Sequence, residues 1–355
     1  MVQRALLDTR LAVRRALAEW CLRDDLGGGS AALVLVGLSG GADSLALAAA
    51  TAYEARRAGL LAGAVVVDHG LQSGSADIAA AAARQAEQLG LAPVIVEQVA
   101  VEDGGAGPEA NARRARYEAF ALAAARTGAA AILTAHTRDD QAEQVLLALA
   151  RGSGTRSLAG IPQRRRLSET GPDTAILRPF LASSPEITRA TTEAACAEAG
   201  LEPWRDPHNS DPAFARVRVR ERVLPMLVEE LGPGMPAALA RSADLAREDA
   251  DALDALAAGI AARANRSIPA GDSDQVALPV AELASLPMAL LARVIRVVAS
   301  RNFGAQLSRE HTASIAALVV DWHGQGPVFV PGIRVARAQS QLGFARQTGS
   351  PRAPR

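Results

Sequence analysis

The stretch ALVLVGLSGGADS, residues 32–44, decides the fold. Its first seven residues form a continuous apolar run of strand length, which is typical of a parallel strand buried on both faces. Two adjacent glycines then predict a tight turn, and the alanine-rich residues 44–58 predict a helix. The stretch therefore predicts a strand, a loop of small residues and a helix in immediate succession.

The same alternation continues to residue 151. After the first unit, the expected strands and helices are, in chain order, residues 62–68, 76–89, 93–97, 108–127, 130–134 and 139–151. Strands that alternate with helices predict an α/β fold with a doubly wound parallel sheet. In such a sheet, ligands bind at the carboxyl ends of the strands, at the point where the strand order reverses.

The loop after the first strand has the chemistry of a phosphate site. Glycines let the backbone approach phosphates closely, and the start of a helix supplies free N–H donors. The expected nucleotide-binding residues are Ser39, Gly40, Gly41, Ala42, Asp43 and Ser44. The Asp43 carboxylate needs a divalent cation between itself and a phosphate, and Mg²⁺ is the expected ion. The alternative is a tight turn whose residues are small for packing alone.

This loop cannot be a Walker A loop, because the sequence contains no lysine and its 38 basic residues are all arginine. No lysine of the protein can therefore act as a catalytic amine or a phosphate clamp. The string SGGADS resembles the PP-loop signature SGGxDS. That resemblance implies an enzyme that cleaves ATP between the α and β phosphates and adenylates a substrate carbonyl.

Three further motifs follow strands or open helices. In VDHGL, residues 67–71, His69 either contacts substrate or caps a turn. In PEANARRARY, residues 108–117, Arg113, Arg116 and Tyr117 share one helix face, which is either part of a site or a solvated charged face.

In TAHTRDDQAEQ, residues 134–144, His136 lies just past the end of a strand. Either Asp139 or Asp140 caps the next helix, and Asp140 and Glu143 share one of its faces with Gln144. The alternative is that these acidic groups only complement the helix dipole.

The remaining motifs are less specific when taken singly. LAGIP at 158–162 and RPF at 178–180 are then turns stiffened by proline, and WRDPHNSD at 204–211 is either a polar loop or part of a site. Four alternating arginines follow, which we expect on a helix with some structural and some contacting phosphate: Arg216, Arg218, Arg220 and Arg222.

In this order, the motifs of residues 31–225 resemble the tRNA(Ile)-lysidine synthetase family. The resemblance implies ATP-dependent ligation of free L-lysine to C2 of cytidine 34 in the CAU anticodon of tRNA(Ile). An adenylated base is the implied intermediate, and lysidine, AMP and pyrophosphate are the products. There are two departures: the family's usual Asp-x-Ser-Asn reads DPHN at 206–209, and Val217 replaces an Asn.

The resemblance also implies roles for single residues. Asp43 is the first candidate for a metal ligand and Asp140 the second, and Arg113 is the candidate for neutralising charge in the transition state. Asp140 and Glu143 are candidates for binding the ammonium group of lysine or helping to deprotonate it. His136 is the candidate for contacting nucleotide or base. A homodimer is an expectation from the resemblance alone.

The second half of the chain predicts a separate, mainly helical domain. We expect an N-terminal helix segment, a catalytic domain, a helical linker, a small tRNA-binding domain and a disordered tail, at residues 1–30, 31–215, 216–239, 240–345 and 346–355. The small domain ends in a Pro-Gly hairpin at 327–344, and residues 164–174 are expected to form an exposed polar loop.

Composition excludes several classes of protein. Hydrophobic residues make up 49% and charged residues 21%, with a formal net charge of +0, so a sizeable core is expected and disorder is not. No apolar run is long enough for a membrane span, and the two separate cysteines suit a reduced, cytoplasmic location without a disulfide framework.

Two competing functions remain at this stage. A tRNA 2-thiolation enzyme is another PP-loop member, but sulfur transfer there commonly uses paired cysteines, whereas Cys21 and Cys196 lie far apart. A catalytically inactive tRNA-binding module is the second alternative. The complete loop, with Asp43 in place, argues against loss of ATP chemistry.

Overall fold

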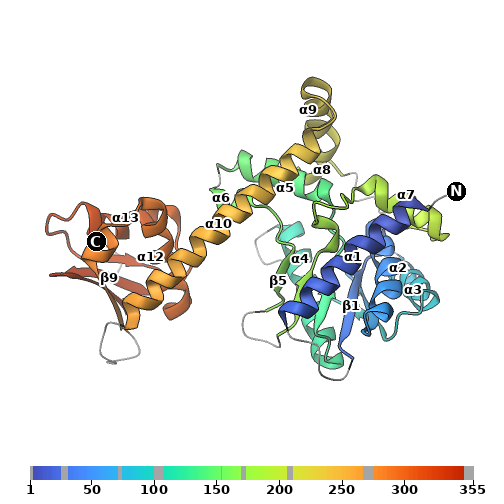
Figure 1. The fold of residues 1–355 in the computed structure, drawn as a ribbon, viewed down its shortest axis with the longest axis horizontal. Helices are drawn as coiled ribbons and strands as arrows, with labels where there is room; N and C mark the ends of the chain where they lie inside the picture. Colours follow the sequence, from blue (N-terminus) through green and yellow to red (C-terminus); the bar gives the residue numbers. More distant parts are fainter. Residues whose placement is uncertain are drawn as a thin grey trace. The chain divides into compact units, whose positions relative to one another are not determined.

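The computed structural model describes residues 3–24, 31–70, 74–99, 107–152, 154–168, 173–205, 211–266 and 275–347. The chain divides into two compact units, Met1–Ala246 and Arg247–Arg355, and the border falls inside the long helix α10 (Met235–Arg266; Figure 1). The sequence predicts this boundary within the helical linker at residues 216–239. The disordered tail was predicted for residues 346–355, of which 348–355 lie outside the described residues. No helix in the described part of the chain is long and apolar enough to cross a membrane.

The larger unit is built on a six-stranded sheet in the order β3-β2-β1-β4-β6-β5. Its strands are β1 (Leu33–Leu38), β2 (Leu61–Asp68), β3 (Val94–Gln98), β4 (Ala131–Leu133), β5 (Arg164–Arg166) and β6 (Ala175–Leu177). All neighbours pair in parallel except β5, which pairs antiparallel with β6 at the edge. The predicted α/β fold with a parallel sheet is confirmed.

The strand order reverses beside β1, because β2 pairs with one of its edges and β4 with the other. The segments after β1 and β4 therefore leave the sheet side by side at its carboxyl edge, where ligands of such sheets bind. Ser39 follows β1 directly, and Thr134 follows β4. Two motifs about 95 residues apart are thus brought together by topology alone.

Helices cover both faces of this sheet. The helices of the larger unit are α1 (Arg4–Arg23), α2 (Ala42–Arg57), α3 (Ser75–Gln88), α4 (Pro108–Thr127), α5 (Arg138–Ala150), α6 (Thr155–Leu158), α7 (Arg189–Ala199), α8 (Ala215–Arg218) and α9 (Leu224–Leu231). One core cluster joins α1, α2, α3 and α7 to alternate strand residues such as Val34 and Leu133. The opposite cluster joins α4 to Leu35, Ile132 and Ile176. Because successive side chains of a strand point to opposite faces of the sheet, the same strands contribute side chains to both cores.

Two local predictions need correction. Residues 164–166 are not an exposed loop, because they form β5, whose backbone pairs with Ala175–Leu177. Neither acidic residue is the N-cap of α5, because Thr137 holds that position and donates its backbone N–H to Asp140 Oδ2 at 2.8 Å. The arginine-rich segment is helical as predicted, and it contains a π-helical turn, Val219–Val223, between α8 and α9.

The smaller unit combines helices with an antiparallel sheet. Its sheet has the order β7-β10-β9-β8, with strands Gln275–Pro279, Gln341–Arg346, Ile333–Ala338 and Val328–Val330. Helices α11 (Val280–Ala284), α12 (Met288–Phe303) and α13 (Arg309–Val320) pack on it. The Pro-Gly hairpin was predicted, but strands β7 and β10 were not, because Gly343, Ala277 and Ala345 weaken their strand pattern.

Gly37 is required by the packing of α4 on β1. A Cβ added there would lie 2.6 Å from Phe120 Cζ, and Phe120 is buried. Gly37→Ala should therefore lower the free energy of unfolding by about 1–3 kcal/mol through overpacking, measured by urea denaturation. Gly154→Ala is the matched control, since a Cβ there meets nothing within 4 Å. Adding Phe120→Leu should recover part of the loss, and equal stability of the Gly37 and Gly154 variants would contradict this account.

Candidate functional site

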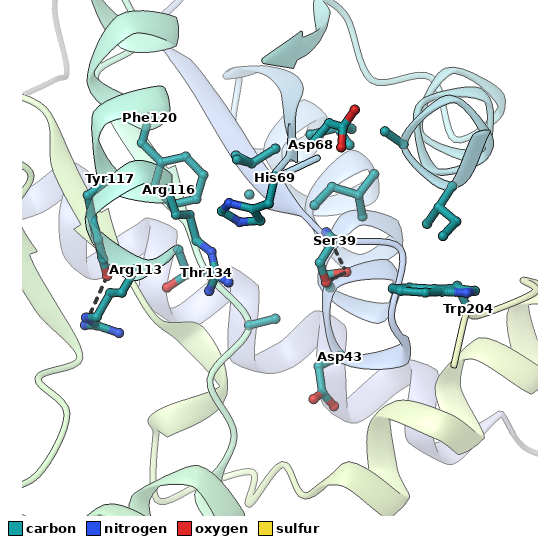
Figure 2. A pocket seen from close by; sticks show the side chains of 18 of the residues that line it. Ser39, Asp43, Asp68, His69, Arg113, Arg116, Tyr117, Phe120, Thr134 and Trp204 are labelled. Carbon is teal, nitrogen blue, oxygen red and sulfur yellow. Dashed lines mark hydrogen bonds between the residues drawn. The ribbon is translucent and has the colours of Figure 1, made fainter. Parts of the chain in front are cut away.

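A cavity of about 340 Å³ opens at the carboxyl edge of the larger sheet. Its walls come from the loop after β1, the end of β2, helix α4 and the segment after β4 (Figure 2). The predicted residues that line it are Ser39, Asp43, Ser44, His69, Arg113, Arg116, Tyr117, His136 and Asp140. Trp204 of the WRDPHNSD motif also lines it, whereas residues 206–210 of that motif lie outside the described residues.

The loop after β1 has the backbone geometry of an anion site. Gly40 has φ +81°, which glycine adopts without strain, and Gly41 is the N-cap of α2. The first N–H groups of a helix have no intrahelical acceptor, so those of Ala42, Asp43 and Ser44 can face a phosphate. The backbone N–H of Trp204 donates to Gly40 O at 2.9 Å and braces the turn from the other side.

The two loop hydroxyls are held close together. Ser44 Oγ donates to Gly41 O at 2.9 Å and lies 3.2 Å from Ser39 Oγ. The Ser39 backbone N–H also donates to Ser44 Oγ at 3.2 Å. This arrangement fixes the shape of the loop, and it leaves the exposed Ser39 hydroxyl available to a ligand.

Helix α7 supports the loop from behind, which sequence reasoning missed. Thr192 Oγ1 lies 2.5 Å from Asp43 Oδ1 and 2.8 Å from Arg189 O, and Cys196 Sγ lies 3.3 Å from Ala42 O. Burial raises the pKa of Asp43 from 3.8 to about 6, although the Thr192 hydrogen bond lowers it. Only an alternation of small and threonine residues marks α7 in the sequence, and that pattern does not indicate a site.

The donor set fits a magnesium ion. Asp43 and Asp140 are carboxylates on the same cavity, and Asp43 has no arginine or histidine in its hydrogen-bonding shell among the described residues. Mg²⁺ typically binds through one or two carboxylates plus phosphates and waters. No group of three His, Cys, Asp or Glu side chains suited to a metal occurs in the described part of the chain. An ion there would therefore depend on a phosphate ligand as well as on Asp43.

Two histidines in the cavity are neutral near pH 7. Burial, followed by the charge of Arg116, lowers the pKa of His69, and its buried Nδ1 has no hydrogen-bond partner within the described structure. Burial, followed by the charge of Arg178, lowers the pKa of His136 to about 3, and His136 Nδ1 lies 3.2 Å from Thr134 Oγ1. Both imidazoles can therefore make neutral hydrogen bonds to a ligand.

Behind Asp140 lies a buried cluster of ion pairs. Glu143 is fully buried and does not line the cavity; its carboxylate oxygens lie 2.8 Å from Arg189, 3.1 Å from Arg216 and 2.8 Å from Arg220. Arg189 also pairs with Asp140 Oδ1 at 2.7 Å. The π-helical turn contributes to this arrangement, because Arg216 and Arg220 both reach one carboxylate.

Asp140 is held as an anion by this cluster. Burial alone would raise the pKa of its carboxyl, but the charges of Arg189 and Arg216 outweigh burial and lower it. Asp140 Oδ2 also accepts the Thr137 backbone N–H. Asp140 is therefore the charged, cavity-lining end of the cluster, and Glu143 is its buried anchor.

The opposite wall is formed by arginines on α4. Arg113 and Arg116 line the cavity next to Tyr117 and lie away from the loop with Ser39 and Asp43 in the view of Figure 2. Arg113 Nη2 lies 3.4 Å from Tyr117 Oη. Arg113 and Arg116 are exposed and Tyr117 is half-buried, and all three line the cavity.

Two family models match the chain. One is described as "PP-loop domain" and covers residues 16–227, and the other as "TilS substrate binding domain" and covers residues 278–342. A tRNA(Ile)-lysidine synthase of Leifsonia xyli subsp. xyli is 58% identical over 317 residues, which cover 89% of this chain and 91% of that protein. One of Salinispora arenicola is 52% identical over 337 residues, which cover 94% of each chain.

A solved structure shares the fold. The U34-tRNA thiolase NcsA from Methanococcus maripaludis superposes with a TM-score of 0.53 and 18% sequence identity, covering 70% of this chain and 81% of that chain. At this identity, the likeness concerns the fold alone.

The raised pKa of Asp43 makes stability depend on pH. Its pKa is higher in the folded than in the unfolded chain, so raising the pH from 3.8 through about 6 destabilises the folded state. The side chain of Asp43→Asn cannot ionise, so this variant does not lose stability as the pH rises. In the absence of ATP and metal, its free energy of unfolding above pH 7 should exceed that of wild type by about 3 kcal/mol. This difference in the free energy of unfolding should shrink as the pH falls from about 6 to 3.8. Urea unfolding across pH measures it, and a pH-independent difference would contradict the assignment.

The buried cluster predicts a large effect at Glu143. Glu143→Gln leaves three partly buried guanidiniums without their shared anion and should lower the free energy of unfolding by about 3 kcal/mol. Asp173→Asn is the matched control: it breaks an ion pair with Arg166 whose side chains are 64% and 78% exposed, and should cost less than about 0.5 kcal/mol. Thermal and urea unfolding compare them, and equal losses would disprove the anchoring role.

Proposed function

Because the chain belongs to the tRNA(Ile)-lysidine synthase family, we propose that its cavity binds ATP and the wobble cytidine of tRNA(Ile) and joins free L-lysine to that base. The chain is an ATP-dependent ligase of tRNA processing. The observation that carries the proposal is that four motifs far apart in sequence converge on one cavity beside the SGGADS loop.

The proposed reaction has two steps. Cytosine O2 attacks the α-phosphorus of ATP, and pyrophosphate leaves. The ε-amine of lysine then attacks C2 of the adenylated base, and AMP leaves with its oxygen. Both steps depend on positioning and on stabilising charge at phosphorus, which fixed hydrogen-bond donors supply in a cavity shielded from water.

The loop holds the pyrophosphate end of ATP. The N–H groups that open α2 and the hydroxyls of Ser39 and Ser44 are its donors. Asp43 would hold Mg²⁺, and the ion would supply positive charge next to the phosphates. Thr192 positions Asp43 by occupying one of its carboxylate oxygens. Arg113 on the facing wall neutralises charge that develops in the transition state.

The middle of the cavity takes the bases. His69 and His136 are neutral and offer hydrogen bonds to nucleotide or base, which uncharged imidazole provides near pH 7. The target base must leave the anticodon stack to enter, and unstacking is cheap in a single-stranded loop.

Asp140 is the proposed partner of the lysine ammonium group. Its lowered pKa keeps it anionic, which suits binding a cation better than removing a proton. The amine has a pKa of about 10.4 in water, so it must lose its proton before attack. Glu143 supports this role indirectly, because it fixes Arg189 and thereby the orientation of Asp140.

The runner-up, 2-thiolation, lacks a suitable sulfur. Cys196 is buried with its Sγ on Ala42 O, and Cys21 lies on α1, so neither is among the residues lining the cavity. The likeness to a thiolase structure does not favour that chemistry at 18% identity.

One assay tests the proposal. Wild-type protein incubated with tRNA(Ile) transcript, ATP, Mg²⁺ and labelled lysine should incorporate label, and a transcript with U34 should not accept it. Asp43→Ala should abolish pyrophosphate release while the protein stays folded. Pyrophosphate release without lysine incorporation would point to another PP-loop enzyme. tRNA binding without any turnover would point to an inactive module.

A further inference from the structure

The edge strand β5 places one arginine beside the cavity wall. In the register of β5 with β6, Arg165 pairs with Ile176, whose side chain belongs to the core under α4. Arg164 and Arg166 pair with Leu177 and Ala175, which belong to the core on the other face. Because strand residues alternate between faces, Arg165 alone of the three faces α4.

On that face, three guanidinium groups surround Tyr117. Arg165 Cζ lies 4.3 Å and Arg113 Cζ 5.0 Å from the centre of its ring. Arg178 Nη2 donates to Tyr117 Oη at 3.0 Å. We call these four residues, Arg113, Tyr117, Arg165 and Arg178, the tyrosine corner.

The tyrosine corner has no anion of its own in the described structure. Arg164 pairs with Asp24 and Arg166 with Asp173, whereas the described part of the chain places no carboxylate within ion-pair distance of Arg113, Arg165 or Arg178. Arg178 is 2% exposed; it also donates to Pro162 O at 2.7 Å, and its buried Nε lacks a partner there. A buried cation with only neutral partners is unfavourable unless a ligand supplies the negative charge.

The electrostatics agree with this geometry. Burial lowers the pKa of Arg178, and Arg165 and Arg113 lower it further, although Tyr117 opposes them. Burial would raise the pKa of Tyr117, but Arg178, Arg113 and Arg165 together lower it. The three guanidiniums therefore repel one another across a single phenol, and a bound anion would relieve that repulsion.

We propose that the tyrosine corner binds a backbone phosphodiester of the substrate RNA next to the base that enters the cavity. Guanidinium groups bind phosphate through several parallel hydrogen bonds. The guanidinium groups of Arg113 and Arg165 lie over the Tyr117 ring, and this contact restricts their orientation. The inference rests on the proposed function, because it takes the base in the cavity to belong to RNA.

The position of the corner favours RNA over ATP as the source of this phosphate. Arg113 and Tyr117 line the cavity, whereas Arg165 is exposed and lies beyond the cavity lining. The site therefore runs from the cavity wall to the surface. A nucleotide that inserts its base leaves its backbone outside, where Arg165 lies. The ground-state donors of the ATP phosphates are at the loop after β1, and Arg113 is the one member of the corner also assigned to the transition state of the ATP step.

The test compares Arg165→Gln with Arg166→Gln. Both remove one exposed charge from the same strand, but Arg166 faces away from Tyr117 and loses only an exposed ion pair. Binding of full-length protein to tRNA(Ile) transcript is measured without ATP or lysine over a range of salt concentrations. Arg165→Gln should weaken binding roughly tenfold and reduce the log–log salt slope by roughly 0.7–1. Arg166→Gln should change neither quantity.

Steady-state kinetics supply the second readout. Arg165→Gln should raise KM for tRNA and leave KM for ATP unchanged. A raised KM for ATP with unaltered tRNA binding would assign the corner to ATP phosphates. Equal tRNA affinity and equal salt slope in the two variants would show that the corner binds no phosphate of the RNA. Either result overturns the proposal. Because binding is measured without turnover, failure of wild type to incorporate lysine would reject the proposed function and still leave the corner tested.

Discussion

The hydrogen bond between Thr192 Oγ1 and Asp43 Oδ1 joins the first turn of α2 to α7, and the rest of the site is arranged around the carboxylate that it holds. In the proposed complex, Asp43 stands next to phosphates, where its negative charge is unfavourable without a cation. The protein places it in a largely buried position with a hydroxyl partner and no arginine in its hydrogen-bonding shell among the described residues. Burial raises the pKa of Asp43 to about 6, and the Thr192 hydrogen bond only partly opposes that shift.

The other two carboxylates of the site, unlike Asp43, are paired with arginines. Asp140 and Glu143 lie one helical turn apart on α5, and three arginines from α7, α8 and the π-helical turn meet them. These arginines hold Asp140 in place at the cavity wall without an external cation. A carboxylate without an arginine partner therefore lies on the same cavity as one that arginines hold, and this contrast underlies the proposed separation of phosphate binding at Asp43 from amine binding at Asp140.

The sequence was informative wherever one short segment carries both fold and chemistry. The run from β1 through Ser44 predicted strand, turn and helix, because apolar continuity, adjacent glycines and alanine-rich helix formers act locally. It did not indicate Thr192, since its partner Asp43 is 149 residues away and a threonine in a helix has no distinctive pattern. Arg165 was assigned to a polar loop for a related reason: three consecutive arginines show no alternation, and β5 exists only because β6 offers an edge.

The two histidines limit how this cavity can respond to pH. Both are neutral near pH 7 in the ligand-free protein, His136 with a pKa of about 3 and His69 with a lowered one. Asp140 is held as an anion by the arginines around it. Asp43, with a pKa of about 6, is a cavity carboxylate that changes charge near neutrality. Any pH dependence of nucleotide binding between about pH 5 and 7 should therefore arise at the phosphate end of the cavity, and the RNA end should depend on ionic strength instead.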